Sequence, residues 1–287
     1  MSVLIVASSE GRAGRSLIAA AVAYRLGRTG IGVTLARLAG DGSADADAKT
    51  FAALEGVNSP GRALAIDAAK AITGDAVLEA PPGSVAPAAS ALGARVLVVG
   101  GGAGDARAGA LAGRILTSVP AAQVRAAAER PGVLAVLPED AALAAPSLAD
   151  IAEAVNGRWL AGDMAGDGIE RVMVGTIASD AASPYFGARA AKCVVTRFDK
   201  VDVQLAALQG DVACLVITGG GQPSPYLVDR VRSTGDGVAL LLAPGSTVET
   251  MRAIEPLYGL SRFDGQRKLE RAVALLDAAN VPVQISA

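Results

Sequence analysis

A short segment near the N-terminus combines small residues, a cation and a hydroxyl in a way that could hold a phosphate group. Gly11, Gly14, Arg15 and Ser16 follow the apolar run Val3–Val6 and precede an Ala- and Leu-rich segment typical of a helix. Unpaired backbone N–H groups and the helix dipole make such a helix start attractive to anions. The arginine adds positive charge, and the serine hydroxyl could bind Mg²⁺. The segment therefore predicts an anion site between a strand and a helix.

Two positions of this loop depart from the phosphate-binding pattern G-x-x-x-x-G-K-[ST]. The pattern requires glycine at 9 and lysine at 15, where this chain has Ser9 and Arg15, whereas Gly14 and Ser16 agree with it. A planar guanidinium does not substitute freely for an ammonium group. ATP and Mg²⁺ are the cofactors that such a loop would take, and the altered residues leave open that it takes none. The alternative is an ordinary strand-to-helix turn rich in small residues.

The composition of the 287-residue chain excludes several classes of function and partner. The net charge of −2 gives no reason to expect nucleic acid as a partner. No apolar run approaches the roughly 18 residues of a membrane span, and no signal peptide is recognisable, so we expect a cytoplasmic protein without membrane attachment. The absence of histidine removes Ser–His catalysis and imidazole metal ligands. Cys193 and Cys214 lie in apolar runs and are expected in the core, with a disulfide or metal site as the alternative.

Apolar strands alternate with Ala-rich helices through the first half of the chain, which predicts an α/β fold with a doubly wound parallel sheet. The expected strands are Val3–Val6, Ile31–Ala36, Ala76–Leu78, Val96–Val99 and Val133–Val136. A cluster of glycine and aspartate at 162–168 interrupts this alternation. We therefore expect two domains, 1–163 and 164–287.

The smaller second domain repeats the alternation. Strands are expected at 172–175, 192–196, 214–218 and 238–242, and helices at 203–208, 226–233, 248–255 and 266–279. In the last of these helices, four charged residues indicate a solvated face: Arg267, Lys268, Glu270 and Arg271. This half is also expected to be α/β.

The first half resembles the dethiobiotin-synthetase-like P-loop proteins in three segments besides the loop. Asp45-Ala46-Asp47-Ala48 precedes a helix, where that family has an Asp-Ala pair that helps to hold Mg²⁺. The segment Asp75–Gly83 is similar to the family's strand that ends in an acidic residue and a Gly-rich turn. Pro138-Glu139-Asp140 matches a segment frequent in one branch of the group. The resemblance implies a P-loop NTPase-like fold.

On this resemblance, Ser16, Asp47 and Glu79 form the candidate magnesium site, since a hydroxyl and two carboxylates are the hard oxygen ligands that Mg²⁺ prefers. Each residue has another interpretation. Ser16 could only bond backbone amides at a helix end, and Asp47 could be an exposed residue of a first helical turn. Glu79 is harder to explain otherwise, because an acidic residue rarely lies in an apolar run without a partner.

The resemblance also implies a position that reads the adenine base. Members that bind ATP often have an asparagine before a Val-Pro or similar segment, and Thr117 occupies that place in Ile115–Pro120. A threonine cannot reproduce the bidentate contact of an amide. Together with Ser9 and Arg15, this difference indicates lost or altered nucleotide use.

The second half is similar to the DRTGG domain. Thr196–Asp202 contains Asp199-Lys200 where the family has an Asp-Arg pair, and Leu215–Gly220 ends in the triplet Thr218-Gly219-Gly220. A dethiobiotin-synthetase-like domain followed by a DRTGG domain is the N-terminal arrangement of long-form phosphate acetyltransferases. This sequence contains no acetyltransferase domain, so acetyl transfer is not expected of it.

The same residues form a candidate second ligand site. Glycines after a strand can hold an anion, so Thr218, Gly219 and Gly220 with Asp199 and Lys200 could bind a small ligand. Alternatively, the glycines form a tight turn with positive φ, and Asp199 and Lys200 are a surface pair or part of a domain interface.

We expect a cytoplasmic regulatory or accessory protein with a degenerate nucleotide-binding domain and a DRTGG-like domain for ligand sensing or oligomerisation. No catalytic residue is assigned. The expected partners are further copies of the chain and a metabolic enzyme. One alternative is an ATP- and Mg-dependent enzyme of the dethiobiotin-synthetase type, and another is a structural pseudoenzyme that binds no nucleotide.

Overall fold

The computed structural model describes residues 2–8, 10–11, 13–101, 110–162, 168–175, 192–210, 212–234 and 237–282. The chain divides into two compact units, of which the first comprises Met1–Leu143 with Phe263–Ala287 and the second comprises Ala144–Arg262. This division differs from the expected boundary at 163/164. The second unit starts about twenty residues earlier, and the C-terminal segment returns to the first unit.

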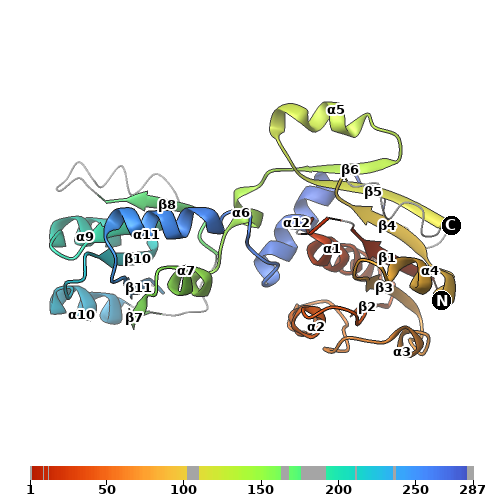
Figure 1. Cartoon of the computed structure of the whole chain (residues 1–287), viewed down its shortest axis with the longest axis horizontal. Helices are drawn as coiled ribbons and strands as arrows, with labels where there is room; N and C mark the ends of the chain where they lie inside the picture. The colour runs from red at the N-terminus through yellow and green to blue at the C-terminus, as the bar shows by residue number, and fades with distance from the viewer. Residues whose placement is uncertain are drawn as a thin grey trace. The chain divides into compact units, whose positions relative to one another are not determined.

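The first unit is built on a six-stranded, fully parallel sheet with the order β2-β3-β1-β4-β5-β6 (Figure 1). Its strands are β1 Val3–Ala7, β2 Val33–Arg37, β3 Asp75–Glu79, β4 Arg95–Val99, β5 Ala110–Val119 and β6 Val133–Pro138. Five of them agree with the expected strands. Strand β5 was not expected, because glycine and arginine interrupt its apolar residues.

Helices cover both faces of this sheet, as its buried strands require. Along β1, Leu4 and Val6 belong to the core on one face and Val3 and Ile5 to the core on the other, since alternate side chains of a strand point to opposite faces. The helices of this unit are α1 Arg15–Arg28, α2 Ala44–Ala52, α3 Ile66–Ala69, α4 Val85–Leu92, α5 Val124–Ala128, α6 Ala141–Ala144 and α12 Gln266–Ala278, with a 3₁₀ turn at Ala121–Gln123. The mixed α/β architecture with a parallel sheet is confirmed.

Helix α12 packs beside α1, which explains why the C-terminal segment belongs to the first unit. Leu269 and Leu276 are fully buried in the same core as α1. Arg271 donates hydrogen bonds of 2.9 and 2.6 Å to Asp140 Oδ2, at the end of β6. The expectation of a solvated charged face was wrong for Lys268, which is 4% exposed and pairs with Asp264.

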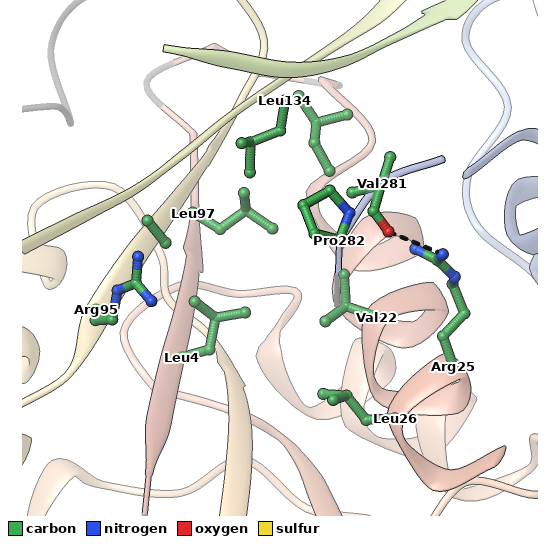
Figure 2. Close-up of a pocket in the computed structure, with 11 residues that line it drawn as sticks. Leu4, Val22, Arg25, Leu26, Arg95, Leu97, Leu134, Val281 and Pro282 are labelled. Carbon is green, nitrogen blue, oxygen red and sulfur yellow. Dashed lines mark hydrogen bonds between the residues drawn. The ribbon is translucent and has the colours of Figure 1, made fainter. Parts of the chain in front are cut away.

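A small cavity of about 110 Å³ lies where the residues after α12 meet α1 and the sheet (Figure 2). Leu4, Leu97 and Pro282 contribute apolar atoms to its lining, and Arg25 closes one side by donating to the Val281 carbonyl oxygen at 3.0 Å. Its walls are largely core side chains. We regard this cavity as a packing gap of the first unit.

The second unit contains a five-stranded sheet with the order β7-β11-β10-β9-β8, in which only β7 is antiparallel to its neighbour. Its elements are α7 Leu148–Ala154, β7 Arg158–Ala161, β8 Arg171–Val174, β9 Lys192–Arg197, α9 Val201–Leu208, β10 Val212–Thr218, α10 Pro225–Thr234, β11 Ala239–Leu242, α11 Thr247–Ile254 and a 3₁₀ turn at Glu255–Leu257. Apolar cores lie on both faces of this sheet. Sequence patterning did not predict β7, which falls inside the expected first domain, 1–163.

Cys193 and Cys214 lie opposite each other on β9 and β10, and both are free and fully buried. Their contact and their burial raise the pKa of the Cys214 thiol. The expectation of buried core thiols is therefore confirmed. Among the described residues, no helix combines the length and the apolarity needed to cross a bilayer.

Candidate functional site

The loop between β1 and α1 lies at the point where the first sheet changes direction. From β1 the chain passes to β2 on one side, and from β4 it passes to β5 on the other. In open α/β sheets, ligands bind in the crevice outside the carboxyl ends of strands at such a switch point. Gly14 precedes α1 with φ of 78°, a left-handed conformation that favours glycine. Ser9 lies outside the described residues, so its role in the loop stays a prediction.

Arg15 and Ser16, the first two residues of α1, both donate to one carboxylate oxygen. Arg15 Nε lies 2.6 Å and Ser16 Oγ 3.0 Å from Glu79 Oε1, at the end of β3. Glu79 is fully buried and the Arg15 side chain is 16% exposed. The two loop groups that were expected to bind phosphate and Mg²⁺ are therefore bonded to an acidic residue of the protein itself.

Arg37, at the end of β2, joins this contact to two aspartates. Its Nε donates to Asp47 Oδ2 at 3.2 Å, its Nη2 donates to Asp41 Oδ2, and its Nη1 donates to the Leu38 carbonyl oxygen at 2.8 Å. The Arg37 side chain is fully buried, and its Nε lies 3.6 Å from Glu79 Oε2. The result is a cluster of two arginines and three acidic residues, which we call the charge cluster: Arg15, Arg37, Asp41, Asp47 and Glu79.

Burial and charge act in opposite directions on the carboxyl groups of this cluster. Burial raises the pKa of Glu79, and the nearby Arg37 and Arg15 only partly offset the effect. Burial also raises the pKa of Asp41, but the charge of Arg37 and its hydrogen bond outweigh it, so the pKa of Asp41 is lowered. Glu79 Oε2 has no hydrogen-bond partner within the described part of the chain. The site thus holds one buried carboxyl group between two arginines.

The expected magnesium ligands are only partly brought together. Ser16 and Glu79 are in contact, whereas Asp47 reaches the same cluster through Arg37. Among the described residues, no group of three or more acidic or cysteine side chains could hold a metal ion. Because the arginine groups already neutralise Glu79, this arrangement does not fit a magnesium ion.

Thr117 lies beside the loop, and its hydroxyl donates to the backbone of the loop itself. Its Oγ1 donates to the Ala13 carbonyl oxygen at 2.8 Å. A cavity of about 210 Å³ adjoins it, lined among others by Glu10, Gly101 and Arg130. The Gly101 N–H donates to Glu10 Oε2 at 3.3 Å, which places a carboxylate of the loop at the end of β4.

Sequence reasoning missed three residues of this region: Glu10, Arg37 and Asp41. Arg37 had a visible signal, since it is a charged residue directly after the apolar run of a buried strand. Glu10 and Asp41 lie in loops, where acidic residues are common and carry no such signal. Gly11 lies in the loop, and a Cβ added there would meet no atom within 4 Å.

At the second sheet, the expected ligand residues lie at or just after the ends of two neighbouring parallel strands, β9 and β10. Thr218 is buried, and its Oγ1 lies 2.8 Å from Thr247 Oγ1 at the start of α11. Gly219 and Gly220 follow with φ of 89° and 73°, and the Gly219 N–H donates to the Gly245 carbonyl oxygen at 2.8 Å. These residues form a compact turn beside the end of β11.

Asp199 and Lys200 follow the end of β9, the parallel neighbour of β10. Asp199 accepts two hydrogen bonds of 3.0 Å from Arg197, which hold its pKa below the ordinary value. Lys200 precedes α9 and is exposed. Phe198, directly before them in the chain, packs so closely on Gly221 that a Cβ there would lie 2.3 Å from its ring.

Comparison with known proteins identifies the second unit. Residues 150–257 match the DRTGG domain, so a DRTGG domain is present. A similar solved structure comprises the CBS and DRTGG domains of the regulatory region of Clostridium perfringens pyrophosphatase, complexed with its activator diadenosine tetraphosphate. The identity is 16% and the TM-score 0.35, over 42% of this chain and 51% of that chain. This chain therefore spans about half of the length of that structure.

Proposed function

We propose that the protein is a regulatory or accessory protein whose first unit binds a polyphosphate-bearing ligand without turning it over. The observation that carries this proposal is the pairing of both Arg15 and Ser16 with Glu79 Oε1, at 2.6 and 3.0 Å. A phosphate loop whose arginine is paired with a carboxylate of the same chain can change its conformation when a ligand replaces that carboxylate. It is poorly arranged to hold Mg²⁺ and a phosphate for reaction.

Three observations support a phosphate loop of the dethiobiotin-synthetase-like type in the first unit. The loop joins a central parallel strand to a helix at the switch point of the sheet. Gly14 has the left-handed conformation that lets the chain enter α1. Arg15 supplies positive charge at the helix start. We place this domain at Met1–Leu143 with Phe263–Ala287, the extent of the first unit.

The DRTGG domain supports a regulatory role for the whole chain. We propose that it senses a ligand or mediates self-association, through the turn at Thr218, Gly219 and Gly220. A homo-oligomer in the cytoplasm, acting on a metabolic enzyme, is the arrangement we favour. Light scattering of the purified protein tests the first part, and a monomer at all concentrations would contradict it.

Thermal unfolding with ATP, in the presence and absence of Mg²⁺, tests ligand binding. We expect ATP to raise the unfolding midpoint, with about 1.4 kcal/mol of stabilisation at a ligand concentration ten times the Kd. Arg15→Ala should abolish the shift, because it removes the loop cation. Phosphate release should not exceed that of a protein-free blank.

The outcomes of this experiment separate the rival functions. No shift with any nucleotide would leave the structural pseudoenzyme. A shift accompanied by phosphate release that Ser16→Ala removes would favour the ATP-dependent enzyme. That second candidate has one observation in its favour, namely the 3.0 Å contact that places a loop hydroxyl and the acidic end of β3 side by side.

A further inference from the structure

We infer that Glu79 acts as an internal competitor of the ligand, an autoinhibitory contact that lowers the affinity of the loop for a polyphosphate anion. This inference rests on the proposed function, because it assumes that the loop binds such an anion. It concerns what controls that binding. Arg15 must leave Glu79 before it can contact a phosphate group beyond the start of α1.

The geometry gives Glu79 the position of a competitor. A single oxygen, Oε1, accepts from both loop groups, Arg15 Nε at 2.6 Å and Ser16 Oγ at 3.0 Å. The other end of the Arg15 guanidinium, Nη2, lies 3.9 Å from Asp41 Oδ2. The side chain thus extends from α1 toward the ends of β3 and β2. Hydrogen bonds to charged groups are about twice as strong as neutral ones. The contact therefore favours the conformation in which Arg15 is bonded to Glu79 and cannot contact a ligand.

Glu79 is not needed to anchor Arg37, which separates competition from a structural role. Arg37 donates to Asp47, to Asp41 and to the Leu38 carbonyl oxygen, and its distance to Glu79 Oε2 is 3.6 Å. Replacing Glu79 by glutamine would therefore leave each of these hydrogen bonds in place. It would also replace a fully buried carboxylate by a neutral group of the same shape.

The competitor also restricts the class of ligand. An anion must attract Arg15 more strongly than a carboxylate with one negative charge at hydrogen-bond distance. A pyrophosphate or longer phosphate chain carries several charges and can do so, whereas a monocarboxylate offers no gain over Glu79. Inorganic pyrophosphate is the simplest probe with this chemistry.

Titration calorimetry of the full chain with inorganic pyrophosphate, in the presence of EDTA, tests the inference. The apparent Kd rises when only a fraction of the molecules is in the conformation that can bind. Glu79→Gln should increase this fraction and so lower the apparent Kd for pyrophosphate on the order of tenfold. The double variant Arg15→Ala with Glu79→Gln should lose this gain. Asp67→Asn is the matched control, since it makes the same charge change at an exposed residue of the first unit and should leave the affinity unchanged.

Each result decides a different claim. Equal affinity of the wild-type protein and Glu79→Gln would overturn the inference and leave the proposed function standing. Absence of binding to both would overturn the proposed function itself. A gain that persists without Arg15 would also refute the competition, because general charge would then explain it. If the glutamine variant does not fold, Glu79→Asp, whose carboxylate is withdrawn by one methylene, should give the same direction of change.

Discussion

The two sheets of this protein both carry polar residues at the carboxyl ends of parallel strands, but the charged groups are buried at the first sheet and exposed at the second. At the first sheet, Arg37 and Glu79 are fully buried and are paired within the charge cluster. At the second sheet, the buried polar groups at these strand ends include the hydroxyls of Thr196 and Thr218. The charged pair there, Arg197 and Asp199, is 57% and 42% exposed.

This difference shows where each region is sensitive to change. A buried charge depends on its partners, because water cannot replace a partner that is removed. An exposed ion pair contributes little, because solvent screens it and surrounds either partner when the other is lost. Changes of charge should therefore affect stability most at the strand ends of the first sheet, and changes of backbone and packing most at those of the second.

The largest effect is expected for Arg37→Met, which leaves Glu79 and Asp47 without their buried cation. We expect a loss of about 3–5 kcal/mol in the free energy of unfolding, measured with urea by circular dichroism. Arg197→Met is the matched control and should leave the unfolding midpoint unchanged. Similar losses for both variants would show that the buried and the exposed charges contribute equally to stability, contrary to the comparison above.

A smaller loss is expected for Gly221→Ala in the second unit. The added Cβ would lie 2.3 Å from the Phe198 ring, so the ring or the turn must move. We expect a loss of about 1–3 kcal/mol in the free energy of unfolding, as for other overpacked sites. In a Phe198→Ala background the same substitution should cost much less. An equal cost in both backgrounds would show that the ring is not the cause.

The smallest effect is expected for Asp41→Asn, and it should depend on pH. Asp41 has a lowered pKa in the folded protein, so its contribution is present above its unfolded pKa and is lost as the pH falls through the folded value. The side chain is 32% exposed, so we expect about 0.5 kcal/mol at pH 7. The difference in unfolding midpoint between wild type and variant should vanish in acid. A difference independent of pH would assign the effect to packing.

Much of the fold could be predicted because its signals are local. The apolar runs around Val3–Ala7 and Arg95–Val99 form strands, and Gln266–Ala278 forms a helix, close to the expected limits. Strand β5, Ala110–Val119, was missed because Gly113 and Arg114 interrupt its apolar pattern. The sequence motifs of Asp199-Lys200 and Thr218–Gly220 indicated a DRTGG domain, which the family match at 150–257 supports.

The candidate site could be predicted only in part. The loop residues Gly14, Arg15 and Ser16 and the acidic residue Glu79 could be selected from their types and neighbours in the sequence. Their mutual contact could not, because it joins positions 64 and 63 residues apart and depends on β3 lying next to β1. Arg37 entered the site for the same reason, through the pairing of β2 with β3.

The sequence by itself determined the alternation of strands and helices, the residue types of the candidate loop and the motifs of the second unit, since each depends on residues close together in the chain. Only the tertiary structure decided which charges neutralise one another and which unit contains α12. Both depend on the order of strands and on burial. Glu79 is fully buried, so its carboxyl group needs a partner within the protein, and Arg15 is that partner.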